Sequence, residues 1–208
     1  MIPLENVGGL GEELNEDIQN IYAKCLKFWE LSSVINLKYR SGMDLDNDIV
    51  NEKYINIFEE DNPLHFAKEL RDVTGIGPDY KFDGMVDAVQ KAYLRMFRIY
   101  GESKDLKEFT GVNPNYGYKG MKESIQSGYL FAFKMGADYL VKCLKSTGIK
   151  PDLKVDSMKE AVQEDYLRLF KLGFIERIQE LKEVTGILPD TELLKKYPQY
   201  AKYFGDSQ

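Results

Sequence analysis

A short phrase recurs along this chain of 208 residues: Thr-Gly, an apolar residue, and a Pro-Asp or Pro-Asn pair that follows after one more position. A weaker first copy reads Ser41-Gly42-Met43. The glycines of the five copies lie 33, 36, 37 and 38 residues apart, which is typical of stacked two-helix repeats. They are Gly42, Gly75, Gly111, Gly148 and Gly186.

Each copy of the phrase has the chemistry of a helix end. Glycine adopts the left-handed conformation just past a helix without a Cβ penalty. The apolar residue after it folds back onto the last helical turn. In the last four copies a proline two positions further on prevents the helix from continuing. The phrase therefore predicts the ends of five helices.

A longer helix is predicted early in each repeat, because apolar residues recur there at every fourth position. Four residues turn about 400°, so each line stays on one broad helical face. A second, shorter helix follows and ends at the Thr-Gly phrase. We expect a turn between the two helices at Gly101, Gly136 and Gly173, and Asp46 is predicted to be an N-cap. The lines are Leu14, Ile18, Tyr22, Leu26; Asp46, Val50, Tyr54, Phe58; Met85, Val89, Tyr93, Phe97; Met121, Ile125, Tyr129, Phe133; and Met158, Val162, Tyr166, Phe170.

The predicted fold class is all-α, a solenoid-like array of about five helix-turn-helix repeats of 33–38 residues with a C-terminal capping helix. We interpret residues 1–208 as a single helical-repeat domain. Residues 1–11 contain three glycines and a proline, and we expect them to form a flexible lead-in. The predicted repeats span residues 14–45, 46–79, 83–115, 119–152 and 156–190, and the cap spans 191–208.

Two known repeat families resemble parts of this sequence. The runs 133–144 and 170–181 resemble the helix, glycine, helix core of ankyrin repeats. The closing run from Thr147 to Asp152 is similar to the end of pentatricopeptide repeats. The resemblance is one of architecture and covers residues 14–190. It implies that a stacked surface recognises a partner, which is a protein for ankyrin-like arrays and single-stranded RNA for pentatricopeptide-like arrays.

The connectors between repeats carry the candidate binding residues. Aromatic residues alternate there with polar residues or glycine, which predicts a short extended segment with one packed face. Residues 113–120 form the most irregular connector. A structural role for these aromatic side chains stays open beside a binding role. The candidates are Tyr80, Phe82, Tyr116, Tyr118 and Lys119.

Few residues in the chain suit catalysis. His65 is the only histidine, so histidine-based metal clusters and a Ser-His-Asp triad with a spare base are excluded, and we interpret His65 as structural or exposed. Asp44, Asp46 and Asp48 imitate the start of a calcium-binding loop, but the glycine and glutamate that such a loop needs are missing. We therefore predict no catalytic residue, no metal, no cofactor and no enzyme activity. A pocket of carboxylates and tyrosines is the remaining enzymatic alternative.

The charge is unevenly distributed. Residues 1–79 hold 16 acidic and 7 basic residues, and the remainder holds 18 and 21. This balance disfavours nucleic acid as a partner, because a binder of phosphate backbones needs a basic stripe. No apolar run reaches the roughly 18 residues of a membrane span, so no membrane contact is expected. Together with the absence of a signal-like N-terminus and of a cysteine framework, this predicts a soluble cytoplasmic protein.

The sequence favours a non-enzymatic protein-protein interaction module or adaptor that binds another protein through its stacked-repeat surface. The alternative is binding of single-stranded RNA along a basic groove. The repeated tyrosines and glutamines have two possible roles: they can support the fold, or they can line a groove. The residues named for the RNA alternative are Lys91, Arg95, Arg98, Lys119, Lys134, Lys142 and Arg168.

Overall fold

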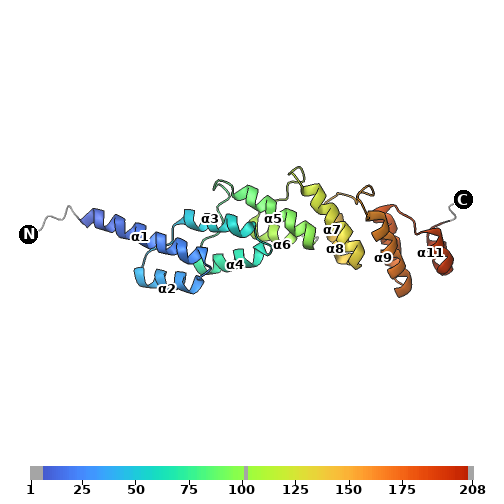
Figure 1. Cartoon of the computed structure of the whole chain (residues 1–208), viewed down its shortest axis with the longest axis horizontal. Helices are drawn as coiled ribbons and strands as arrows, with labels where there is room; N and C mark the ends of the chain where they lie inside the picture. Colours follow the sequence, from blue (N-terminus) through green and yellow to red (C-terminus); the bar gives the residue numbers. More distant parts are fainter. Residues whose placement is uncertain (1–6, 101–102, 206–208) are drawn as a thin grey trace, which may run out of the picture. The chain divides into compact units, whose positions relative to one another are not determined.

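A computed structural model describes residues 7–100 and 103–205, without the side chains of residues 7–13, 31 and 100. These residues form helices joined by turns, with no strand in the described ranges, so the predicted all-α class is confirmed. Figure 1 shows the helices in chain order. They are α1 (Val7–Lys27), α2 (Leu31–Ser41), α3 (Asn47–Phe58), α4 (Pro63–Thr74), α5 (Met85–Tyr100), α6 (Lys104–Thr110), α7 (Met121–Met135), α8 (Asp138–Lys145), α9 (Met158–Leu172), α10 (Ile175–Thr185), α11 (Thr191–Lys196) and the 3₁₀ helix η2 (Pro198–Tyr203).

The chain divides into two compact units. Unit 1 comprises residues 1–92 and 109–112, and unit 2 comprises residues 93–108 and 113–208. Within unit 1, α1 packs on α2 and α3, and α4 packs on α2 and α3. Within unit 2, α7 packs on α8 and α9, and α9 packs on α10. In both units the long helix of one repeat therefore contacts the long helix of the next.

Four of the five predicted helix ends are confirmed, whereas α8 already ends at Lys145, three residues before Gly148. All five glycines of the recurring phrase have a positive φ, between 67° and 76°. The N–H of Gly75 donates to the carbonyl of Arg71, and the N–H of Gly186 donates to the carbonyl of Lys182. The threonine before the glycine stabilises the helix end further, because the Thr185 hydroxyl donates to the Leu181 carbonyl and accepts from the N–H of Ile187. This is why threonine and glycine recur together.

The predicted apolar lines form the core. From the second repeat onward every apolar member of a line is buried, and the carboxylate of Asp46 accepts from the N–H of Asp48 as an N-cap should. Leu14 was wrongly predicted to belong to this core, because its side chain is 58% exposed. The reason is length: α1 has 21 residues, whereas α2 has 11, so the first turns of α1 extend beyond the helix that covers the rest.

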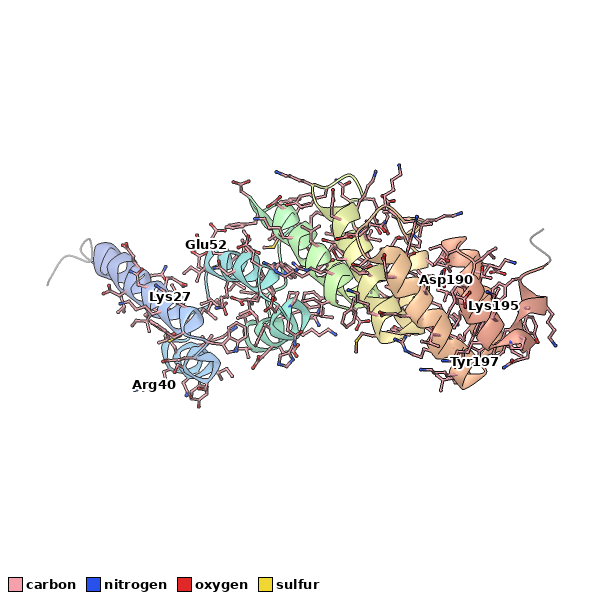
Figure 2. The ribbon with its side chains drawn as sticks, turned by 45° about the vertical axis from the view of Figure 1, so that its right-hand side comes forward. Lys27, Arg40, Glu52, Asp190, Lys195 and Tyr197 are labelled. Atoms are coloured by element: carbon pink, nitrogen blue, oxygen red, sulfur yellow. The ribbon has the colours of Figure 1, made fainter. Side chains whose placement is uncertain are left out.

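The two ends of the chain compare differently with their predictions. The flexible lead-in is wrong for residues 7–11, which lie inside α1, while residues 1–6 lie outside the described residues. At the other end, the predicted cap is helical and is interrupted before Pro198, which cannot continue α11, so the cap forms two short helices, α11 and η2. Figure 2 labels Asp190, Lys195 and Tyr197 in this cap.

The turns between paired helices agree with the sequence where they are described. Gly136 and Gly173 end α7 and α9 with φ of 65° and 74°. Gly101, the third predicted turn, lies outside the described residues.

The connectors between repeats are turns, so the predicted extended segments are wrong. The N–H of Phe82 donates to the Asp79 carbonyl, and the N–H of Tyr118 donates to the Asn115 carbonyl. The side chain of the same residue closes the turn, since the Asn115 side-chain oxygen accepts from the N–H of Gly117. Asp and Asn favour such local bonds to the following backbone. The polar residue after proline therefore folds each connector tightly.

The repeated tyrosines and amides of the first, second, fourth and fifth repeats fasten the connector to the long helix of the same repeat. The Tyr129 hydroxyl donates to the carbonyl of Ile149, the residue after a helix-ending glycine, at 3.0 Å. Gln126 spans the same connector, donating to the Lys150 carbonyl and accepting from the N–H of Asp152. The same tyrosine bond forms at Tyr22, Tyr54 and Tyr166, and the same amide position bonds its connector at Gln19, Asn51 and Gln163. The side chains at both repeated positions, the tyrosine and the amide, therefore bond to the backbone of the connector.

Candidate functional site

The candidate residues of the first connector lie in unit 1, and both are half-buried. Burial raises the pKa of the Tyr80 hydroxyl to about 12, although the nearby charge of Arg71 opposes the rise. Phe82 takes part in the turn before α5 through its carbonyl, which accepts from the N–H of Met85. Packing and turn formation account for both residues.

The other three candidates lie in the connector before α7, in unit 2. Tyr116 packs on Phe97 with ring centroids 6.4 Å apart, and burial raises the pKa of its hydroxyl. Tyr118 is half-buried and Lys119 is exposed. Tyr116 also lines a groove of unit 2, whereas Tyr118 and Lys119 do not.

The groove lies between α6 and α8 and has a volume of about 640 Å³. We call it the lysine groove. Lys104 and Lys107 come from α6, and Lys142 comes from α8. Tyr116 of the connector and Tyr139 of α8 add aromatic surface. No described residue lining this groove is acidic.

Carboxylates stand at the rim of the lysine groove. Glu108 lies 3.7 Å from the ammonium of Lys104, and Glu180 lies 3.7 Å from that of Lys142. The Lys104–Glu108 pair is solvent-exposed, and in the Lys142–Glu180 pair the lysine is exposed and the glutamate is partly buried. Exposed pairs contribute at most about 1 kcal/mol. A carboxylate from a partner can therefore take the place of Glu108 with little loss.

The second feature is a set of exposed apolar side chains at the turns between paired helices in unit 2. We call it the apolar edge. Met135 and Tyr139 are more than 60% exposed, and Leu172 and Phe174 are more than 50% exposed. Ile175 completes the edge. Large contiguous apolar patches on a protein surface mark interaction sites.

Arg168 of α9 connects that helix to the C-terminal end of α7, beside the first turn of the apolar edge. Its guanidinium donates to the carbonyls of Phe133 and Lys134 at 3.2 and 2.6 Å, which lie at the open C-terminal end of α7. Gly136 allows this approach, because a Cβ there would lie 2.3 Å from an Arg168 nitrogen. The ion pair of Asp138 with Arg177 joins the starts of α8 and α10. These contacts therefore connect the helices that carry the apolar edge.

Asp165 is the buried carboxylate beneath this arrangement, with 2% of its surface exposed. Burial raises its pKa to about 6, although the Arg168 guanidinium at 2.8 Å opposes the rise. The raised pKa means that the folded state holds the proton more tightly than the unfolded chain. Compared with the unfolded chain, the folded state therefore favours the neutral, protonated carboxyl group of Asp165.

We expect the free energy of unfolding to rise by about 1 kcal/mol between pH 7 and pH 5 through Asp165 alone. The gain begins as pH falls through about 6 and is complete below about 4, where the unfolded chain also binds the proton. Urea unfolding at several pH values would measure it in wild type and in Asp165→Asn, which cannot titrate. An equal pH slope in both proteins would contradict the raised pKa.

The described residues give no sign of a metal site or of a membrane-spanning helix. They contain no group of three or more His, Cys, Asp or Glu side chains that could hold a metal ion, and no helix among them is long and apolar enough to cross a membrane. His65 is exposed and contacts the ring of Phe66. Buried tyrosine hydroxyls donate to backbone carbonyls, as Tyr54 does to Ile76, and burial raises the pKa of the Tyr54, Tyr129 and Tyr166 hydroxyls.

The sequence signal for the groove and the edge was weak. Lys142 was named only for RNA binding, and Tyr139 was not singled out, because a tyrosine early in a short helix fits a buried stripe as well as an exposed one. The feature that could have found the edge is the apolar composition of residues 172–175, directly beside a helix-ending glycine.

Comparison with known protein families, curated proteins and solved structures finds no match for this chain.

Proposed function

We propose that this chain is a helical-repeat module that binds another protein through the apolar edge and the lysine groove of unit 2. The observation that carries the proposal is the position of Tyr139, which is 61% exposed on the edge and also lines the groove. One partner segment can therefore place apolar side chains on the edge and an acidic side chain between the lysines. The resemblance to ankyrin and pentatricopeptide repeats stays a prediction.

The solenoid-like array belongs to the same proposal. Contacts between successive long helices, α1 with α3 and α7 with α9, support it within each unit. The uniform fastening of the connectors by tyrosine and amide side chains supports a common repeat geometry. A stacked arrangement of this kind would present the turns of successive repeats on one side.

The RNA alternative has less support. Lys91 forms ion pairs with Glu59 and Asp87. Arg168 donates to a carbonyl of α7 and forms an ion pair with Asp165. Single-stranded RNA needs a basic track with aromatic platforms on which bases stack. The apolar edge adds the aliphatic side chains of Met135, Leu172 and Ile175 to its aromatic ones, and these aliphatic side chains suit a protein partner better than nucleotide bases.

Variants of the two surfaces test the proposal in an affinity capture from a native lysate, with quantitative mass spectrometry and with or without nuclease. The edge variant is Leu172→Ser with Phe174→Ser, and the groove variant is Lys107→Glu. We expect one set of nuclease-resistant partners to fall at least tenfold with the edge variant. The groove variant should weaken the same partners severalfold, and more strongly at low salt.

Two matched controls keep the result specific. Val86→Ser removes an exposed apolar side chain from α5, and Lys159→Glu reverses an exposed charge on α9. Both should capture the partners as wild type does, with unchanged helix content by circular dichroism. Partners that bind all variants equally would overturn the assignment of the surface. Loss on nuclease treatment would favour RNA instead.

A further inference from the structure

Helix α1 in unit 1 carries a second apolar stripe besides the one that it buries. Tyr22 and Leu26 face the core, with at most 1% of their surface exposed. Leu14, Ile21 and Phe28 are 58%, 45% and 70% exposed. Leu14 and Ile21 lie seven residues apart, which places them on one side of α1, and Phe28 follows at the same spacing directly after the helix ends at Lys27.

The exposed stripe extends into a heptad seam. Ile18 and Cys25 lie between its members and are partly exposed. Positions 14, 18, 21, 25 and 28 alternate steps of four and three residues, the spacing by which two helices pack knobs into holes. With Leu14, Ile21 and Phe28 at the d positions, Ile18 and Cys25 occupy a positions. The seam is thus built like one half of a two-helix coiled coil.

The flanking charges specify the partner. Asp17 and Lys24 are both exposed and occupy successive g positions on one flank of the seam. In a parallel pair a g position faces an e position of the other helix, and Tyr22 occupies one of those here. In an antiparallel pair g faces g, so Asp17 of each copy meets Lys24 of the other. Opposite charges at these positions set helix orientation.

We propose that the protein forms a two-fold symmetric dimer in which the α1 helices of two copies pair antiparallel along this seam. Matching Ile18 of one copy with Ile21 of the other brings both Asp17–Lys24 pairs into register and places Leu14 against Cys25. The same surface serves on both copies, as a two-fold axis requires. Antiparallel helix dipoles add to the attraction. Figure 2 marks Lys27 on α1.

A charge exchange tests the pairing by sedimentation equilibrium of the full chain. Wild type should be dimeric at tens of micromolar. Asp17→Lys or Lys24→Asp alone should raise the dissociation constant at least tenfold, because two like-charged contacts replace two attractive ones. The double variant Asp17→Lys with Lys24→Asp should restore the dimer. The control Lys68→Asp reverses an exposed charge on α4 and should change nothing.

Disulfide trapping tests the orientation in a Cys143→Ser background. Leu14→Cys should form a covalent dimer with a bond between residue 14 of one copy and Cys25 of the other. Cys25 alone should not cross-link, since eleven residues of offset separate the two copies of it by about 16 Å along the axis. A monomeric wild type, unaffected single variants, or a bond between two Cys25 thiols would overturn the proposal.

Discussion

Replacing Gly128 with alanine is expected to lower the free energy of unfolding by about 3 kcal/mol, although alanine favours a helix more than glycine does. Gly128 lies inside α7, where a Cβ would stand 2.3 Å from the backbone oxygen of Phe97 in α5. The same Cβ would lie 3.2 Å from a methyl group of Leu144. A carbon and a carbonyl oxygen come no closer than about 3.3 Å, so the helices must separate by roughly 1 Å.

The backbone oxygen makes this cost hard to avoid. A flexible side chain could turn away, but the carbonyl of Phe97 is fixed by its own helix, and the core around it is packed densely. Gly77 is the matched control, since it has open space around its Cβ position and no positive φ. Urea unfolding followed by circular dichroism should show Gly77→Ala within about 0.5 kcal/mol of wild type. A similarly small effect at Gly128 would mean that α5 and α7 do not approach so closely.

Gly128 also shows where sequence reasoning reaches its limit. A glycine after threonine at a regular interval predicts a helix end, because the local backbone alone requires a left-handed residue there. A glycine in the middle of a helix, such as Gly128 beside Tyr129, carries no such local signal. Its reason lies in Phe97 and Leu144, which belong to other helices. Only the packed structure brings these residues together.

The same distinction separates the correct predictions from the wrong ones. The buried lines and the helix ends before Gly42, Gly75, Gly111 and Gly186 depend on period and on local backbone chemistry, both of which can be read from one segment. The exposure of Leu14 depends on the lengths of two helices, and the connectors depend on competition between packing and the local turn-forming bonds of Asp79 and Asn115. The lysine groove likewise combines residues from α6, a connector and α8.

Replacing Tyr166 with alanine is expected to cost about 4 kcal/mol, the largest effect of any single change considered. The side chain is fully buried in α9. Its ring lies 6.0 Å from that of Phe170 and 5.8 Å from that of Phe204, measured between centroids. Its hydroxyl donates to the Ile187 carbonyl at 2.7 Å. Alanine would leave a cavity, lose both ring contacts and release the connector that follows α10.

Tyr166→Phe separates the two contributions, because it keeps the ring and removes the hydroxyl. We expect it to cost about 1 kcal/mol, since the Ile187 carbonyl loses its donor while half-exposed. Tyr39→Ala, at a side chain that is 88% exposed, is the control for tyrosine loss and should be nearly neutral. The size of the phenylalanine effect decides what the recurring tyrosine is for. If Tyr166→Phe were as damaging as Tyr166→Ala, the hydroxyl bond to the connector would be the main support of the repeat. If it were neutral, ring packing alone would explain why tyrosine recurs in every long helix.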